Sequence, residues 1–277
     1  MRPAVFVLLA ISLFSSFRSV SQILSEMEAE EDKLLARTKQ VNQFFRRFNG
    51  EEDVKGNRLY PGYKDFRSPE LRKNYLKILV DNQSKNISGD LYREFISVIT
   101  DRQNPYYLDF HTNNWSAQVD VELNYGGQTR NGILFMEIEK ERLGYKWVIN
   151  SAYFHPFVEY FIGDTTYTKK FLHPMSHEVE FMNLRKIFDD SDSLQQYFIR
   201  GYKPDQMSLF LYEAGRGYLK FNKVLNVKFH FFQIPGWYFE LTYVNRGGYN
   251  SGWMITNLVT YKPEEEAMLR SYIFYEK

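Results

Sequence analysis

One pattern occurs twice in this chain of 277 residues and constrains its fold more than any other feature. In each copy an apolar run of strand character leads through a turn into a second apolar run that begins near a glycine and a tryptophan. The first copy spans residues 133–150 and contains Trp147, and the second spans residues 237–257 and contains Trp253. A helix-rich stretch precedes each copy. The repetition therefore predicts two small α+β domains in tandem.

The first half begins with helical periodicity. Apolar residues recur at helical spacing over residues 23–48, and Asn49-Gly50 is a signal for a helix C-cap. Ser68-Pro69 is typical of a second helix start, and this helix is predicted to continue to about residue 81. We expect Asp90 to cap a third helix.

The period of the apolar residues then changes to two. Residues 115–123 alternate between apolar and polar side chains, which is typical of a half-buried strand. Two further strands are predicted at residues 133–139 and 146–154. The second half repeats the order of helices and then strands, with segments at residues 176–188, 205–214, 218–232, 237–244 and 252–261.

This order of elements resembles the NTF2-like superfamily. Residues 41–45 and the strands at 115–123, 133–139 and 145–153 carry the resemblance, which the second half shares more weakly. It implies the fold class α+β, with two NTF2-like domains, each with helices packed in a strongly curved, mainly antiparallel sheet around a pocket. A single β-barrel of lipocalin type is the competing fold, and two separate helix-rich segments argue against it. The superfamily contains both enzymes and non-catalytic binding modules, so the resemblance fixes no reaction.

The N-terminus has the composition of a secretory signal peptide. Arg2 precedes an apolar stretch over residues 4–14, and Ser19-Val20-Ser21 offers small residues for cleavage before Gln22. The apolar stretch is too short to span a bilayer, although a membrane anchor or a first helix of the fold is the alternative interpretation. The predicted division is a signal peptide at 1–21, a first domain at 22–155, a linker at 156–175 and a second domain at 176–277.

The composition limits the cellular compartments and the binding partners that are possible for this chain. The chain has no cysteine, so it has neither disulfides nor the lipidated cysteine of a bacterial lipoprotein. We expect a secreted or periplasmic protein, with no transmembrane segment after signal cleavage. A net charge of +1 gives no electrostatic case for nucleic acid binding. The expected partner is a protein, a glycan or a small molecule, and no cofactor is expected.

Two histidines come close to a metal-binding pattern. His173 and His177 have the spacing of neighbours on one face of a helix. Pro174 and Ser176 mark a helix start between them, however, which places His173 outside the helix. We therefore expect no metal site.

Three residues are the candidates for acid–base catalysis. Asp109 and His111 are two apart just before the first strand, so their side chains could share one face of the extended chain and transfer a proton. Glu137 lies between apolar residues of a predicted strand, where burial would raise its pKa. The competing interpretations are a hydrogen-bonded pair at the surface and a solvated carboxylate.

Aromatic and acidic residues of the predicted strands are the candidates for ligand binding: Trp115, Tyr145, Glu240 and Tyr243. We expect the repeated Trp147 and Trp253 in the core, because a large aromatic residue at the start of a final strand packs against the helices. No complete catalytic motif occurs. The sequence therefore favours an exported, non-catalytic binding or assembly module of the cell envelope. The alternative is a small-molecule isomerase, dehydratase or hydrolase with a pocket in the first domain.

Overall fold

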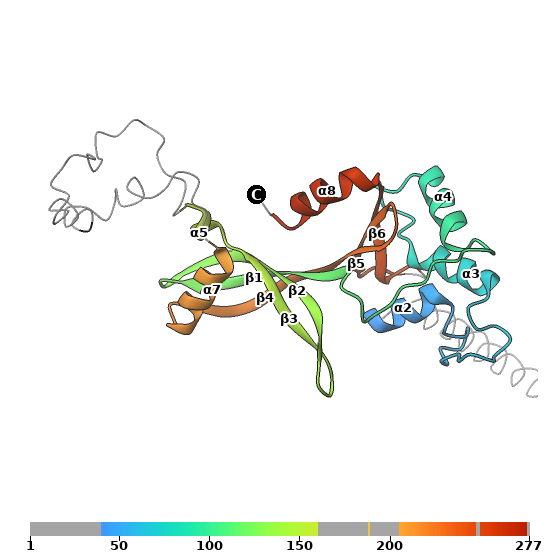
Figure 1. The fold of residues 1–277 in the computed structure, drawn as a ribbon, viewed down its shortest axis with the longest axis horizontal. Helices are drawn as coiled ribbons and strands as arrows, with labels where there is room; N and C mark the ends of the chain where they lie inside the picture. The colour runs from blue at the N-terminus through green and yellow to red at the C-terminus, as the bar shows by residue number, and fades with distance from the viewer. Residues whose placement is uncertain (1–39, 160–187, 189–204, 248–249, 276–277) are drawn as a thin grey trace, which may run out of the picture. The chain divides into compact units, whose positions relative to one another are not determined.

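The computed structural model describes residues 40–159, 188, 205–247 and 250–275 (Figure 1). The elements of the first half are the helices α2 (Val41–Asn49), α3 (Pro69–Leu79) and α4 (Gly89–Ile99) and the strands β1 (Trp115–Tyr125), β2 (Gln128–Glu141) and β3 (Gly144–Tyr153). The later elements are α5 (His155–Glu159), α7 (Gln206–Gly215), β4 (Leu219–Ile234), β5 (Trp237–Val244), β6 (Gly252–Thr260), the 3-10 helix η2 (Pro263–Glu265) and α8 (Glu266–Ile273). The predicted α+β class is confirmed.

The residues at the helix ends explain where the helices begin and end. Gly50 closes α2 in the left-handed conformation, with a φ of 70°, as the sequence predicts. Ser68 caps α3 by accepting a hydrogen bond from a backbone N–H of the first turn at 3.2 Å. The prediction that Asp90 caps the third helix is wrong. Ser88 caps α4, because its extended backbone lets its hydroxyl oxygen accept from the first turn at 3.1 Å, which leaves Asp90 inside the helix.

Several predictions fall on residues outside the described part of the chain. These are the signal peptide at 1–21, the portion of the long helix before residue 40, the linker from residue 160 onward and the helix at 176–188 apart from its last residue. The helix predicted at 205–214 is confirmed as α7, which Asp205 caps through its carboxylate.

All six described strands belong to one sheet, in the order β3-β2-β1-β4-β5-β6. The strands of the two sequence halves therefore meet where β1 lies beside β4. β4 pairs antiparallel with β5, and β5 pairs antiparallel with β6. The segment predicted at residues 218–232 is one strand of 16 residues. Two separate sheets, which the tandem arrangement implies, are not observed among the described residues.

The chain divides into two compact units, and each contains segments from both sequence halves. Among the described residues, unit 1 comprises those within 40–117, 138–146 and 227–275, and unit 2 comprises those within 118–137 and 147–226. Each unit has its own core and is described by itself.

The core of unit 1 is aromatic. α2 contributes Phe44, Phe45 and Phe48, which are buried together because they fall on one face of the helix. The ring of Phe44 lies 5.9 Å from that of Phe231 on β4, and Phe48 stacks on Phe239 of β5 at 6.2 Å. Phe231 and Phe239 are opposite each other in the β4–β5 pair and stack at 4.6 Å. This core joins a helix of the first half to strands of the second half.

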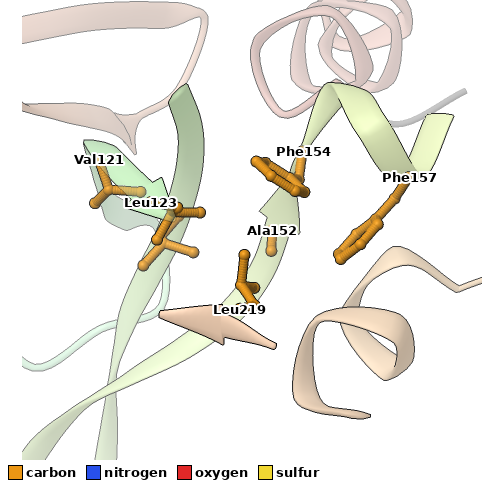
Figure 2. Packing of buried hydrophobic residues seen from close by; sticks show 7 residues of the cluster. Val121, Leu123, Ala152, Phe154, Phe157 and Leu219 are labelled. Carbon is orange, nitrogen blue, oxygen red and sulfur yellow. The ribbon is translucent and has the colours of Figure 1, made fainter. Parts of the chain in front are cut away.

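Unit 2 has a second core of apolar side chains that point toward one another in Figure 2. They come from four strands and from the segment around α5: Val121 and Leu123 of β1, Leu134 of β2, Ala152 of β3, Leu219 of β4, and Phe154 and Phe157. Partly buried side chains of α7, namely Met207, Leu209 and Phe210, pack against them. One face of the unit 2 strands is therefore covered by helices.

The prediction that Trp147 lies in the core is wrong, because 41% of its surface is exposed. Successive side chains of a strand point to opposite faces, and Ala152 is the β3 residue that faces the core. Trp147, five residues earlier, therefore faces away from the helices. Trp253 is half-buried, with its ring 5.0 Å from that of Phe229 and 5.5 Å from that of Tyr243.

Candidate functional site

The predicted Asp109–His111 pair lies at the surface of unit 1, with both side chains exposed. The Asp109 carboxylate accepts a hydrogen bond from the backbone N–H of His111 at 2.9 Å. The Nδ1 atom of His111 lies 3.8 Å from the same oxygen, which is too far for a hydrogen bond. The side-chain amide of Gln233 holds the loop by accepting from the N–H of Asp109 and donating to its carbonyl, both at 2.7 Å. The pair is fixed in place but exposed to solvent.

Tyr145 joins this pair, whereas Trp115 does not. The ring centroid of Tyr145 lies 4.1 Å from that of His111, and Tyr145 is exposed. Trp115 is only 2% exposed, and its Nε1 donates to the carbonyl oxygen of Phe110 at 3.0 Å. Of the residues predicted to bind a ligand, Trp115 is thus part of the core of unit 1.

The other three predicted site residues have separate surroundings. Glu137 is a half-buried residue of β2 in unit 2. Glu240 on β5 forms an ion pair with Lys228 at 3.4 Å, and Tyr243 packs its exposed ring near Trp253. Since Glu240 and Tyr243 are three residues apart on one strand, their side chains point to opposite faces of the sheet. They do not form a common site.

A buried polar pair in unit 1 was missed by the sequence analysis. The Nδ1 of His230 and the hydroxyl oxygen of Tyr238 are 2.8 Å apart, and both residues are buried. Burial lowers the pKa of His230 to about 3, and the charge of Lys228 acts in the same direction. Burial also raises the pKa of Tyr238. Both groups are neutral near pH 7, so the pair satisfies buried polar atoms and offers no proton for exchange at that pH.

The sequence does hold one signal for His230. It lies between Phe229 and Phe231, which both face the aromatic core, so strand alternation places it on the opposite face. The ring of Phe274, which follows α8, lies 5.8 Å from the His230 ring on that face. Residue spacing could not predict that Phe274 covers His230, because this contact depends on where the C-terminal helix α8 packs.

A pocket of about 370 Å³ lies in unit 1 near the start of α3 and the end of α4. Three arginines line it together with smaller and aromatic residues: Arg67, Pro69, Arg72, Thr100, Asp101, Arg102, Pro105 and Tyr107. The side chain of Arg72 is 1% exposed and donates to three main-chain carbonyls, those of Phe48 at 3.0 Å, Ile99 at 2.8 Å and Tyr106 at 2.5 Å. Two of these carbonyls lie in the last turns of α2 and α4, whose dipoles favour a cation. Arg72 thereby joins the ends of two helices.

Arg67 and Arg72 share one aromatic neighbour in this pocket. Their Cζ atoms lie 4.3 Å and 4.6 Å from the ring centroid of Tyr107. Arg67 forms an ion pair with Glu51, through Nε at 2.8 Å and Nη2 at 2.5 Å. Burial lowers the pKa of Arg72 to about 10, and the positive charge of Arg67 acts in the same direction.

Unit 2 exposes large apolar side chains. On β3, Trp147 and Ile149 share one face and are 41% and 37% exposed. On β4, Phe221 and Leu225 are also exposed, and strand alternation puts them on the same face as the buried Leu219. β3 is at the end of the strand order, so one side of its backbone has no partner strand among the described residues. Exposed apolar side chains on an edge strand are typical of a protein-binding surface.

The described residues offer neither a metal site nor a membrane-spanning helix. The described ranges contain no group of three or more histidine, aspartate or glutamate residues arranged to hold a metal ion. His173 and His177 lie outside those ranges. None of the described helices is both long enough and apolar enough to cross a membrane.

Comparisons with known proteins give no relative for this chain: no protein-family model, no curated protein and no solved structure matches it.

Proposed function

We propose that this chain is an exported, non-catalytic binding module that holds a protein partner at strand β3 of unit 2. The partly exposed Trp147 and Ile149 carry the proposal, because they give an edge strand an apolar face on which 41% and 37% of these side chains is exposed. Tryptophan is among the residues that contribute most to binding energy at protein interfaces. An edge strand also offers backbone N–H and C=O groups with which an extended segment of a partner can pair.

The alternative, a small-molecule isomerase, dehydratase or hydrolase, has less support. General acid–base catalysis requires groups within hydrogen-bond reach of the transferred proton, about 3 Å, or one bridging water. Asp109 and His111 are exposed and 3.8 Å apart, and the imidazole packs against Tyr145. This arrangement fits a hydrogen-bonded surface loop better than a catalytic centre.

The NTF2-like resemblance and the export of the chain remain parts of the proposal. The antiparallel pairs of β4–β6 and the helices of unit 1 are compatible with the α+β class that the resemblance implies. Export rests on the composition of residues 1–21. N-terminal sequencing of the protein from its native cells should give Gln22 as the first residue. A chain that still begins at Met1 would contradict export by a cleaved signal.

Site-specific photocrosslinking in the native cells tests the binding surface. A benzophenone side chain is placed at Trp147 or Ile149, and at the exposed Arg130 of β2 as the matched control in the same unit. The expected result is one discrete protein adduct from positions 147 and 149, and none from position 130. Adducts of equal yield from all three positions, or none from 147 and 149, would refute this function.

A further inference from the structure

The arginine pocket of unit 1 contains a positive charge that no ion pair of the described residues neutralises. Arg67 and Arg72 carry like charges beside the same ring of Tyr107, within 4.6 Å of its centroid. Two guanidinium groups in one pocket repel each other, and the repulsion is larger where burial lowers the effective dielectric. Arg72 is fully buried, so this charge cannot move away into solvent.

The nearby carboxylates leave Arg72 without an anionic partner. Glu51 is bound to Arg67, and no carboxylate of the described residues lies within 4.0 Å of the Arg72 guanidinium. Asp101 lines the pocket, but its carboxylate accepts from the backbone N–H groups of Gln103 and Asn104, both at 2.8 Å. Arg72 is therefore held by main-chain carbonyls and by the rings of Phe48 and Tyr107, which are neutral groups and compensate a full charge only in part.

The third arginine is available to a ligand from solvent. Arg102 has a long contact with Glu70 at 3.7 Å, and both side chains are exposed, so solvent screens this pair. The fork of a guanidinium binds the paired oxygens of a carboxylate or phosphate, and it exchanges a weak surface partner at little cost. The pocket thus combines three guanidinium groups. That of Arg72 is buried, that of Arg67 is paired with Glu51, and that of Arg102 is exposed to solvent.

The backbone also fixes Arg67 in an uncommon conformation. Its φ is 57°, in the left-handed region that a residue with a side chain rarely adopts, and its N–H donates to the carbonyl of Gly50 at 2.9 Å. Strained residues of this kind occur preferentially at binding and catalytic sites.

We propose that this pocket binds an oxyanion, a carboxylate or a phosphate group, between the guanidinium groups of Arg67 and Arg102, with the buried charge of Arg72 behind it. The volume of about 370 Å³ is near the lower end for ligand pockets, so the ligand is a free anion or a small organic acid of about the size of one sugar ring. This site belongs to unit 1 and is independent of the protein-binding function proposed for unit 2.

Calorimetric titration of the mature full-length protein tests the proposal with three probes at constant ionic strength: inorganic phosphate, glucuronate and neutral glucose. We expect phosphate or glucuronate to bind and glucose not to bind. Tighter binding of glucuronate would identify an organic acid as the ligand. Tighter binding of phosphate would identify a free inorganic anion as the ligand. If neither anion binds, or if glucose binds as well as glucuronate, the site is refuted.

Arginine variants locate the bound anion. Arg102→Gln removes an exposed charge. It should weaken the binding of the anion about tenfold, as expected for the loss of a charge-assisted hydrogen bond of about 1.5 kcal/mol. Arg93→Gln is the matched control, since Arg93 is an exposed arginine of α4 that pairs with Asp90 within its own helix. Equal losses in the two variants would show unspecific screening and refute the site. Arg67→Gln should weaken binding further, and its folded state is checked by its thermal transition.

Discussion

At the scale of single residues, Gly50 is the position where three segments of unit 1 come closest together. It ends α2 with a φ of 70°, and a Cβ atom added there would lie 2.8 Å from Cγ of Arg72 and 3.2 Å from Cα of Arg67. Gly50→Ala therefore combines a strained backbone with a steric clash, and we expect a loss of about 2–3 kcal/mol in the free energy of unfolding. Urea denaturation measures it.

Gly56 is the control for this prediction. It has a φ of 83°, and a Cβ atom there would meet nothing within 4 Å. Gly56→Ala should cost about 1 kcal/mol, which is the backbone contribution alone. Equal losses at the two glycines would show that the Arg72 side chain moves aside without cost.

His230 should make the stability of the protein fall as the pH is lowered below neutrality. Burial lowers its pKa to about 3 in the folded state, whereas the pKa of an unfolded histidine is about 6.5. The unfolded chain therefore binds the extra proton in this range, and the stabilisation present above about pH 6.5 is lost progressively toward pH 3, by at most about 1.4 kcal/mol per pH unit. Urea denaturation at several values between pH 7 and pH 5.5 measures this slope, since most carboxylates do not titrate there.

Two variants separate the causes of that slope. His230→Gln keeps a polar group beside the Tyr238 hydroxyl but does not titrate, so its slope should be smaller than that of the wild type. Tyr238→Phe removes the hydrogen bond and leaves His230 buried, so most of the slope should remain. A wild-type slope in His230→Gln would assign the pH dependence to other groups.

The residues of the candidate sites differ in how far a sequence can predict them. Asp109 and His111 are two residues apart, and this spacing correctly indicated that they lie close together. The arginine pocket could not be predicted in this way, because Arg67 and Arg72 meet Tyr107 only after three segments have packed. Arg72 is a charged residue of a helix, and the sequence would therefore predict that it is exposed. It is buried because its guanidinium donates to carbonyl oxygens at the ends of α2 and α4.

At the scale of elements, the two tryptophans of the first-half strands differ in burial from what the sequence predicts, since Trp147 was expected in the core and Trp115 at a ligand site. Trp115 is 2% exposed and Trp147 is 41% exposed. Trp115→Ala should therefore reduce the free energy of unfolding by about 3–5 kcal/mol, as for other buried large aromatic residues. Trp147→Ala should change it by less than about 1 kcal/mol. Thermal and urea denaturation of the two variants compare them directly, and a larger loss for Trp147 would show that its exposed face is covered in solution.

The existence of the elements was predictable, whereas their exact ends and faces were less so. Period-two alternation located β1, and the Ser68 and Gly50 signals located helix ends, because these effects act within a few residues. Ser88 and Asp90 are both good capping residues, and their order along the chain does not decide between them. The outward face of β3 was not predictable, since Ala152 and Trp147 are both acceptable core residues and α5 and α7 select the face.

At the scale of the whole molecule, the sequence repeat predicted two blocks of three strands, each in its own sheet, whereas the described strands of both blocks share one sheet. Each block could close its own sheet, or both could share one, because the alternation of apolar residues is the same in the two cases. The observed order joins the blocks where β1 lies beside β4. This pairing connects residues about 100 positions apart, and no local signal in either strand specifies it.

The first half of the chain should not fold alone. In unit 1, Phe44 and Phe48 pack against Phe231 and Phe239, which a chain that ends at residue 160 lacks. The same truncation removes Arg246, whose Nη2 lies 2.6 Å from the Asp81 carboxylate. Exposing this aromatic core would cost several kcal/mol, at about 25 cal/mol per Å² of apolar surface, which is comparable with the whole stability of a domain.

We therefore expect a chain of residues 22–160 to show no cooperative thermal transition by calorimetry, while the full mature chain shows one. The tandem arrangement predicts the opposite, namely an independent domain that ends near residue 155. A sharp transition of the truncated chain would mean that α2 finds its apolar partners within the first half, and the shared aromatic core of unit 1 would then not be required for folding. Adding residues 205–277 as a separate chain makes the test more specific. If the contacts of α2 with β4 and β5 drive folding, the two fragments should regain a cooperative transition only when they are mixed.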